Sequence, residues 1–96
     1  MSVTIKDLLD KNIAFISDDK TVHIICNDIF VLGADCEIIT KETLPEFNQA
    51  VDDCFGNLEL AAILYCARRF KLRPLKKEYE YIPRNLWPIF DACGPG

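Results

Sequence analysis

The hydrophobic pattern of the chain is organised around one segment, residues 57–72. No charged residue falls between Leu60 and Ala67. A helix that is apolar on all sides belongs inside a domain, so this pattern predicts the central helix of the core. Asn57 is a favourable N-cap, and Arg68 begins a basic last turn that suits the carbonyl end of a helix dipole. We therefore expect the rest of the chain to pack around this helix.

The N-terminal half predicts a short helix followed by a small antiparallel sheet. Residues 4–9 begin with a capping residue and carry an inward apolar stripe. Residues 12–17 and 21–26 are β-type runs separated by the turn-forming sequence Ser-Asp-Asp-Lys. An apolar run at 29–32 predicts the third strand, although four consecutive apolar residues are also compatible with a buried helical turn. Residues 34–42 show no clear period and are predicted to be a connector.

The C-terminal half predicts two more helices around the central one. Thr43 and Glu46 have the spacing of a capping box, and the helix that they begin ends near Gly56. Because the central helix follows at once, the two are predicted to form a helical hairpin. Residues 76–81 are predicted to cross the surface, and residues 85–92 to form a last short helix.

Together these elements predict a fold class. We expect a single α+β domain spanning residues 1–96, in which a short antiparallel β-meander packs against a helical hairpin and a C-terminal helix. The chain has 96 residues, half of them apolar, which is sufficient for one domain with its own core. No apolar run approaches the ~20 residues that span a bilayer, and the first residues lack the layout of a signal peptide. The expected location is therefore the cytoplasm.

Cysteine is frequent for a chain of this length, and the five positions are Cys26, Cys36, Cys54, Cys66 and Cys93. No two of them form a C-x-x-C pair, so we interpret them as free thiols that pack as small hydrophobic groups. The alternative, a metal site of Cys26, Cys36 and the single histidine His23, matches no structural zinc spacing. A nucleophilic cysteine would need a base, and strand alternation predicts that His23 points away from Cys26. Neither a metal nor a cofactor is expected.

Charge is segregated along the sequence although the net charge is −4. Up to Glu59 there are twelve acidic and four basic residues, a sum of −8, and from Leu60 onward there are three acidic and seven basic residues, a sum of +4. Such a distribution predicts a dipolar surface that can steer protein partners or polyanions. The simpler interpretation is that cations gather at a helix C-terminus and that the remaining charges are only solvated.

Two candidate binding surfaces follow from this asymmetry. The acidic set, which could compete with nucleic acid for a basic groove on another protein, comprises Asp18, Asp19, Asp28, Asp35, Glu37, Asp52 and Asp53. The basic–aromatic set, which could contact phosphates or anchor a partner, comprises Arg68, Arg69, Lys71, Arg73, Lys76, Lys77, Tyr79, Tyr81 and Arg84. The late aromatic residues, including Trp87, either cap the core from outside or serve as anchors for a partner.

No sequence motif supports catalysis. The chain has one histidine and lacks a Gly-rich phosphate loop, a nucleophile elbow and a metalloprotease signature. Adjacent carboxylates such as Asp52 and Asp53 point in different directions along a helix, so they do not form an acid–base pair. We therefore expect no enzymatic activity and no catalytic residue.

Two stretches of the sequence together resemble a known class of protein. The first contains Cys26-Asn27-Asp28-Ile29-Phe30 and Ala34-Asp35-Cys36-Glu37, and the second is residues 66–75. A strand entering Asn-Asp-x-Phe, then Ala-Asp-x-Glu, then an apolar helix ending in Arg-x-Pro-Leu resembles small uncharacterised proteins encoded by bacteriophages and prophages. The resemblance implies expression in the cytoplasm of a bacterial host, among short reading frames that encode inhibitors or modifiers of host machinery. Anti-CRISPR proteins and inhibitors of host nucleases are the members of that class that best suit a small acidic domain.

Two functions are predicted from these observations. The first is a non-enzymatic module that binds a bacterial host protein complex and inhibits or modulates its handling of nucleic acid through a charged surface. The alternative is a small protein that binds nucleic acid directly through its basic segment, residues 68–84; against it stands the acidic composition of the whole chain. A homodimer formed through the aromatic C-terminal region is compatible with either function.

Overall fold

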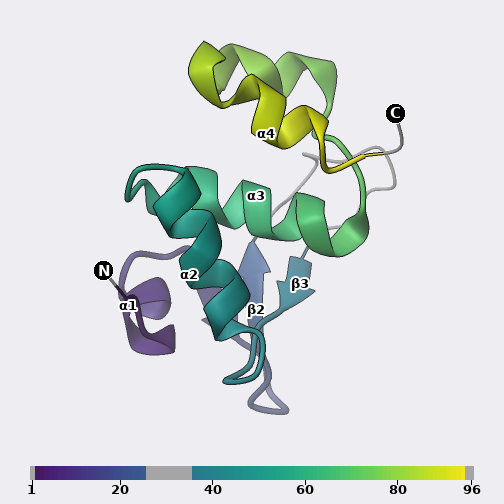
Figure 1. Cartoon of the computed structure of the whole chain (residues 1–96). Helices are drawn as coiled ribbons and strands as arrows, with labels where there is room; N and C mark the ends of the chain where they lie inside the picture. The colour runs from purple at the N-terminus through teal and green to yellow at the C-terminus, as the bar shows by residue number, and fades with distance from the viewer. Residues whose placement is uncertain (1, 26–35, 95–96) are drawn as a thin grey trace.

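Three short strands form an antiparallel sheet in the N-terminal half. The computed structural model describes residues 2–25 and 36–94. The strands β1 (Ala14–Ile16), β2 (Val22–Ile25) and β3 (Cys36–Ile38) lie in the order β1-β2-β3, and both neighbouring pairs are antiparallel. Helices pack on this sheet, so the chain has the predicted α+β fold (Figure 1).

The register of the sheet places one strand face in the core. Ile24 of β2 pairs with Ala14 on one side and with Glu37 on the other, and its side chain is fully buried. The next residue, Ile25, is exposed on the opposite face. The predicted alternation of β2 is therefore confirmed, because successive side chains of a strand point to opposite faces.

The third strand lies at a position that the local pattern does not indicate. Residues 36–38 belong to a predicted connector, yet they form β3 by pairing with β2, with Ile38 opposite His23. Three residues are too few to show a period, so the assignment of a connector was wrong; pairing with a neighbouring strand outweighs a weak local preference. The predicted strand at 29–32 lies outside the described residues.

Two helices begin with different caps. In α1 (Ile5–Asp10), the backbone N–H of Asp7 donates to the Thr4 hydroxyl and the Asp7 carboxylate accepts from the Thr4 N–H, which is a complete capping box. The capping box predicted for α2 (Leu44–Asp53) is wrong: the Thr43 side chain makes no cap hydrogen bond. Its hydroxyl instead accepts from the Thr40 N–H at 2.9 Å, because a turn precedes this helix.

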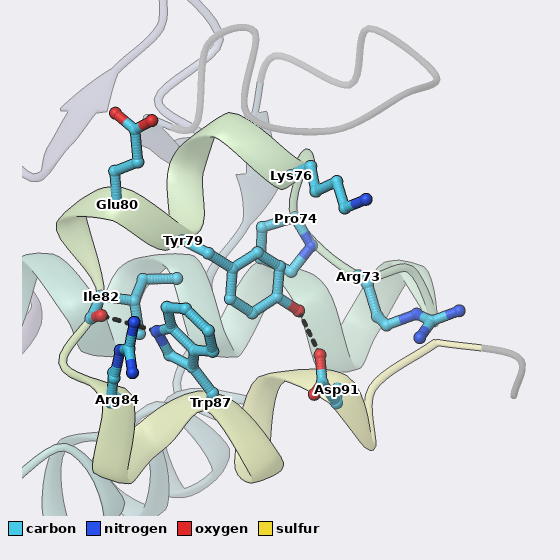
Figure 2. A pocket seen from close by; sticks show the side chains of 9 residues that line it. All are labelled: Arg73, Pro74, Lys76, Tyr79, Glu80, Ile82, Arg84, Trp87 and Asp91. Carbon is cyan, nitrogen blue, oxygen red and sulfur yellow. Dashed lines mark hydrogen bonds between the residues drawn. The ribbon is translucent and has the colours of Figure 1, made fainter.

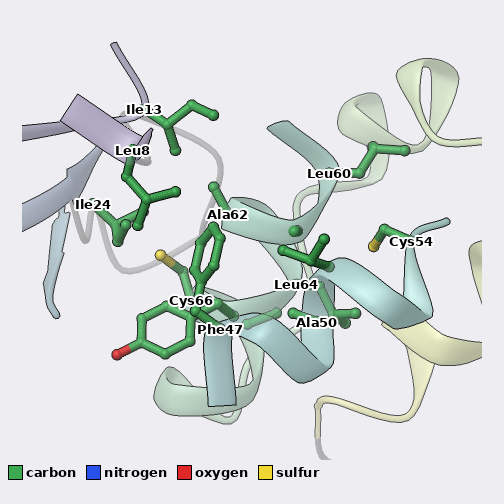
Figure 3. Packing of buried hydrophobic residues seen from close by; sticks show 14 of the residues in the cluster. Leu8, Ile13, Ile24, Phe47, Ala50, Cys54, Leu60, Ala62, Leu64 and Cys66 are labelled. Atoms are coloured by element: carbon green, nitrogen blue, oxygen red, sulfur yellow. The ribbon is translucent and has the colours of Figure 1, made fainter. Parts of the chain in front are cut away.

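The central helix, α3 (Leu58–Phe70), lies between the sheet on one side and the C-terminal helices on the other (Figure 1). The Asn57 side chain caps it by accepting from the Leu60 N–H at 3.0 Å, as predicted. Figure 3 shows Ile24 on the sheet side of α3, whereas Ala50 and Cys54 lie on the α2 side. Neighbours on several sides explain why residues 60–67 of α3 are apolar on all sides.

The C-terminal segment forms three short helical elements above α3. It comprises the 3₁₀ helices η1 (Lys76–Tyr81) and η2 (Arg84–Leu86) and the α-helix α4 (Trp87–Asp91). Residues 76–81 are therefore more regular than predicted, and the predicted last helix begins as a 3₁₀ turn. Buried side chains of Ile82, Leu86 and Phe90 attach this segment to the core. None of the helices within the described ranges is long and apolar enough to cross a membrane.

The cysteines that can be described are free thiols. Cys54 and Cys66 are buried in the core, and Cys93 is half-buried. Burial, and then the charge of Asp53, raises the pKa of the Cys54 thiol to about 11. Burial also raises the pKa of Cys93. Both thiols are therefore protonated at neutral pH, which suits the packing role that we predicted.

Candidate functional site

A pocket of about 810 Å³ opens between η1 and α4, in the C-terminal segment (Figure 2). This volume lies in the range typical of ligand-binding clefts. We call it the C-terminal pocket; its wall consists of Arg73, Pro74, Lys76, Tyr79, Glu80, Ile82, Arg84, Trp87 and Asp91. It is larger than two further pockets in the described parts of the chain, which have volumes of about 410 and 370 Å³.

The two aromatic side chains of the pocket are fixed by hydrogen bonds within the wall. The Trp87 indole N–H donates to the backbone carbonyl of Ile82 at 2.7 Å, and the Tyr79 hydroxyl donates to the Asp91 carboxylate at 2.8 Å. The rings meet edge to face, with centroids 5.5 Å apart and an interplanar angle of 79°. Because both polar groups already have partners, the aromatic part of the wall offers apolar surface in a fixed orientation.

The hydrogen bond at Tyr79 has an electrostatic consequence. Burial, the hydrogen bond to Asp91 and the negative charge of Asp91 raise the pKa of Tyr79 to about 12. The phenol therefore remains a neutral donor at any physiological pH.

Three cations surround this apolar surface. Figure 2 shows Arg73 and Lys76 at one end of the pocket and Arg84 at the other, with Tyr79 and Trp87 between them. The Arg84 guanidinium lies 5.4 Å from the centroid of the Trp87 ring, within cation–π distance. The wall also contains two carboxylates, Glu80 and Asp91, so cations outnumber anions there although the whole chain is acidic.

Gly94 packs directly against Arg73, a residue of the pocket wall. A Cβ atom at this position would lie 2.7 Å from Cγ and 2.9 Å from the backbone N of Arg73. Since the backbone of Arg73 cannot move away cheaply, we expect Gly94→Ala to lower the free energy of unfolding by about 1–3 kcal/mol. Urea unfolding followed by circular dichroism measures the effect, with Ala92→Ser at an exposed site as the control. An unchanged urea midpoint would show that the close approach is not a constraint.

The basic–aromatic set predicted from sequence is only partly assembled. Four of its nine members, Arg73, Lys76, Tyr79 and Arg84, line the C-terminal pocket. Arg68 and Arg69 instead form ion pairs with α2, to Asp53 at 2.8 Å and to Glu46 at 3.2 Å. The remaining members, Lys71, Lys77 and Tyr81, do not line it; Lys71 is the left-handed C-cap of α3, and Tyr81 is 77% exposed.

The acidic set is spread over separate elements. Asp28 and Asp35 lie outside the described residues. Asp18 and Asp19 belong to the β1–β2 turn, Glu37 lies half-buried in β3, and Asp52 and Asp53 end α2. One member of each predicted set, Asp53 and Arg68, meet in an ion pair, so the segregation of charge along the sequence is weaker in space.

Asp19 organises the turn that it occupies. Its carboxylate accepts hydrogen bonds from the Ser17 hydroxyl and from the Thr21 backbone N–H. These bonds lower the pKa of Asp19 from its ordinary value of 3.8 to about 2. Because the folded-state value is the lower one, the carboxylate stabilises the hairpin fully above about pH 4, and this contribution is lost as the pH falls through about 2.

A pH series tests the role of Asp19. The difference in free energy of unfolding between the natural chain and Asp19→Asn is expected to be constant near neutral pH and to shrink from about pH 4 down to about pH 2. Denaturant unfolding at each pH measures it, with the neighbouring exposed residue changed in Asp18→Asn as the matched control. A difference that does not change over this range would contradict the assignment.

Sequence reasoning did not place several residues of the C-terminal pocket. The predicted site residues do not include Pro74, Glu80, Ile82 and Asp91, and for Trp87 the sequence leaves open whether the side chain caps the core or anchors a partner. The signal that was present is the density of aromatic, proline and arginine residues between 73 and 91, a composition typical of binding surfaces. No group of three or more potential metal ligands occurs in the described parts of the chain.

Comparison with known proteins identifies no relative of this chain. Neither a protein-family model, nor a curated protein, nor a solved structure matches this chain significantly. The C-terminal pocket and its charges are therefore the observations from which a function can be argued.

Proposed function

We propose that the chain is a non-enzymatic module that binds a protein partner by taking an apolar, acidic segment of that partner into the C-terminal pocket. The observation that carries this proposal is the combination of a fixed aromatic wall with cations at both ends of the pocket. Tryptophan, tyrosine and arginine are the residues that contribute most often to the energetic centres of protein interfaces.

The chemistry of the wall defines the partner segment. An apolar side chain would lie against Trp87 and Tyr79, whose N–H and O–H groups are already bonded and demand no partner from the ligand. Carboxylates on either side of that side chain would meet Lys76 at one end and Arg84 at the other. Charged groups at such a rim mainly select the partner and speed association, whereas the buried apolar contact supplies affinity.

A binding role suits the chemical state of the polar groups better than a catalytic one. The pKa values of the Cys54, Cys93 and Tyr79 side chains are all raised, so each of them is protonated at neutral pH. A nucleophile or general base requires the opposite shift.

The partner that we propose is a nucleic-acid-handling complex of a bacterial host, which the module would inhibit or modulate. The support for this step is the resemblance of the sequence to phage-encoded proteins, together with the cations that line the C-terminal pocket of an otherwise acidic chain. The cytoplasm of the host would then be its place of action. Inhibition requires only that the occupied segment of the partner also be needed for its activity.

Direct binding of nucleic acid is the second candidate, and the pocket itself favours it. Three cations beside two aromatic rings could bind phosphates and bases. Against it, Tyr79 and Trp87 stand nearly perpendicular and Arg84 lies near the Trp87 ring, so one base cannot stack on both rings. A salt-sensitive mobility shift with single-stranded DNA or RNA, lost in Arg84→Glu, would favour this candidate.

Trp87 provides the test of the proposal, because it is the only tryptophan of the chain and lies in the pocket wall. We expect a short synthetic peptide with one phenylalanine between aspartates to change the Trp87 emission in a saturable manner. The same peptide with lysines in place of the aspartates is expected to bind at least about tenfold more weakly, because the cations of the pocket would repel it.

Two variants with the same change of charge make the test specific. Arg84→Glu reverses a cation of the pocket and is expected to abolish the preference for the acidic peptide. Lys6→Glu introduces the same charge at an exposed site of α1 and is expected to leave the titration unchanged. Equal binding of both peptides by the natural chain, or an equal effect of both variants, would overturn the proposal.

A further inference from the structure

The turn between α2 and α3 presents an aromatic side chain to solvent. Phe55 is 78% exposed, the largest exposed fraction among the large hydrophobic residues described. Its backbone is left-handed, with φ of 56°. A bulky residue is unfavourable in this conformation, where asparagine or glycine is usual. The fold therefore holds an exposed ring at a position where both solvent and backbone disfavour it.

The sequence around Phe55 is acidic. Residues 52–59 contain Asp52, Asp53 and Glu59 and no basic residue. Asp52 and Glu59 are exposed, in the last turn of α2 and the first turn of α3, on either side of Phe55. Asp53 is bonded to Arg68. The turn thus carries an exposed apolar ring near the exposed carboxylate of Glu59, which is the chemistry that the C-terminal pocket suits.

We infer that the C-terminal pocket of one copy of this chain binds the α2–α3 turn of a second copy, with Phe55 against Trp87 and Tyr79. The carboxylate of Glu59 then faces the cations of the pocket, Arg84 and Lys76. The inference rests on the proposed role of the C-terminal pocket and names one occupant for it. In the absence of another partner, the protein covers its own binding site.

The contact joins two different surfaces, so it leaves a free pocket on one copy and a free turn on the other. Such a head-to-tail contact extends into longer assemblies unless its rotation closes a ring. The mass of the protein in solution is therefore expected to rise with concentration. The rise is expected to be smaller at high salt, because the flanking charges are exposed and screened.

Two variants separate the two halves of the contact. Phe55→Asn removes the ring and relieves the left-handed backbone, so it is expected to fold at least as stably as the natural chain and to remain monomeric. Arg84→Glu keeps the turn but places a carboxylate where that of Glu59 would bind, so it is also expected to remain monomeric. Tyr81→Asn, at a residue that is 77% exposed and outside the pocket wall, is the control that should associate normally.

Mixing the variants decides the inference. Phe55→Asn retains the pocket and Arg84→Glu retains the turn, so an equimolar mixture can form one natural contact per pair. Sedimentation velocity is expected to show a 1:1 complex in the mixture and monomers in each variant alone. A natural chain that stays monomeric at every concentration, association by Phe55→Asn alone, or a mixture that contains only monomers would overturn the inference.

The peptide titration distinguishes a failure of the self-association from a failure of the proposed function. If Phe55→Asn binds the acidic peptide but forms no complex with Arg84→Glu, the self-association is wrong and the pocket still binds acidic segments. If Phe55→Asn binds neither the peptide nor the second variant, the proposed role of the pocket fails as well.

Discussion

Phe47→Ala is expected to lower the free energy of unfolding by about 3–5 kcal/mol, the largest effect that we predict for any single change. The Phe47 side chain is fully buried where α2 meets α3, and the centroid of its ring lies 5.5 Å from the centroid of the Tyr65 ring. The Tyr65 hydroxyl in turn donates to the Ile38 carbonyl of β3 at 3.2 Å. Removing the Phe47 ring therefore opens a cavity between α2 and α3, beside the residue through which α3 contacts the sheet.

Phe55→Ala is the matched control, because it makes the same chemical change at an exposed site. Its effect on the free energy of unfolding of the monomer is expected to stay within about 0.5 kcal/mol. Urea unfolding at low protein concentration measures both variants. A loss of less than about 1 kcal/mol in Phe47→Ala would mean that the contact of α2 with α3 does not form the core.

Trp87→Ala is expected to weaken binding of the acidic peptide by about 30-fold or more. This factor corresponds to the loss of about 2 kcal/mol that marks an energetic centre of an interface. The indole forms part of the pocket wall, meets Tyr79 edge to face and is held by the hydrogen bond to Ile82. Its removal takes away both the apolar contact and the fixed orientation of the wall.

Binding by this variant is measured by the anisotropy of a labelled peptide, since the fluorescent residue is absent. Trp87→Phe keeps an aromatic ring and is expected to retain part of the affinity, which a general loss of structure would not allow. Circular dichroism and urea unfolding establish that the variants are folded. An affinity equal to that of the natural chain would show that the peptide binds elsewhere.

The fold was predictable where the sequence carries a strong local signal. The absence of charge from Leu60 to Ala67 predicts a helix covered on several sides, and α3 lies between the sheet and the C-terminal helices. The pattern of β2 predicts that neighbouring side chains point to opposite faces, and Ile24 is buried whereas Ile25 is exposed. By contrast, β3 is too short to show a period and depends on its pairing with β2, which no local pattern records.

For the candidate site, the sequence predicted only that basic and aromatic residues are frequent in the C-terminal part, not which of them lie together. Charge counting grouped Arg68 with Arg73 and Arg84, but the direction of a helical side chain is set by packing. Arg68 faces Asp53 of α2, whereas Arg73 and Arg84 lie at the pocket. The sequence predicts that the helix ends at Phe55 and Gly56, but the exposure of the Phe55 ring is known only from the structure.

Affinity capture from a nuclease-treated bacterial lysate tests the central claim most directly, namely that the C-terminal pocket binds a protein partner. The natural chain, Arg84→Glu and Lys6→Glu are used as baits, and the retained proteins are identified by mass spectrometry. We expect components of a nucleic-acid-handling complex to be retained by the natural chain and by Lys6→Glu and to be lost with Arg84→Glu. Retention of the same proteins by all three baits, or loss of every protein after nuclease treatment, would contradict the claim.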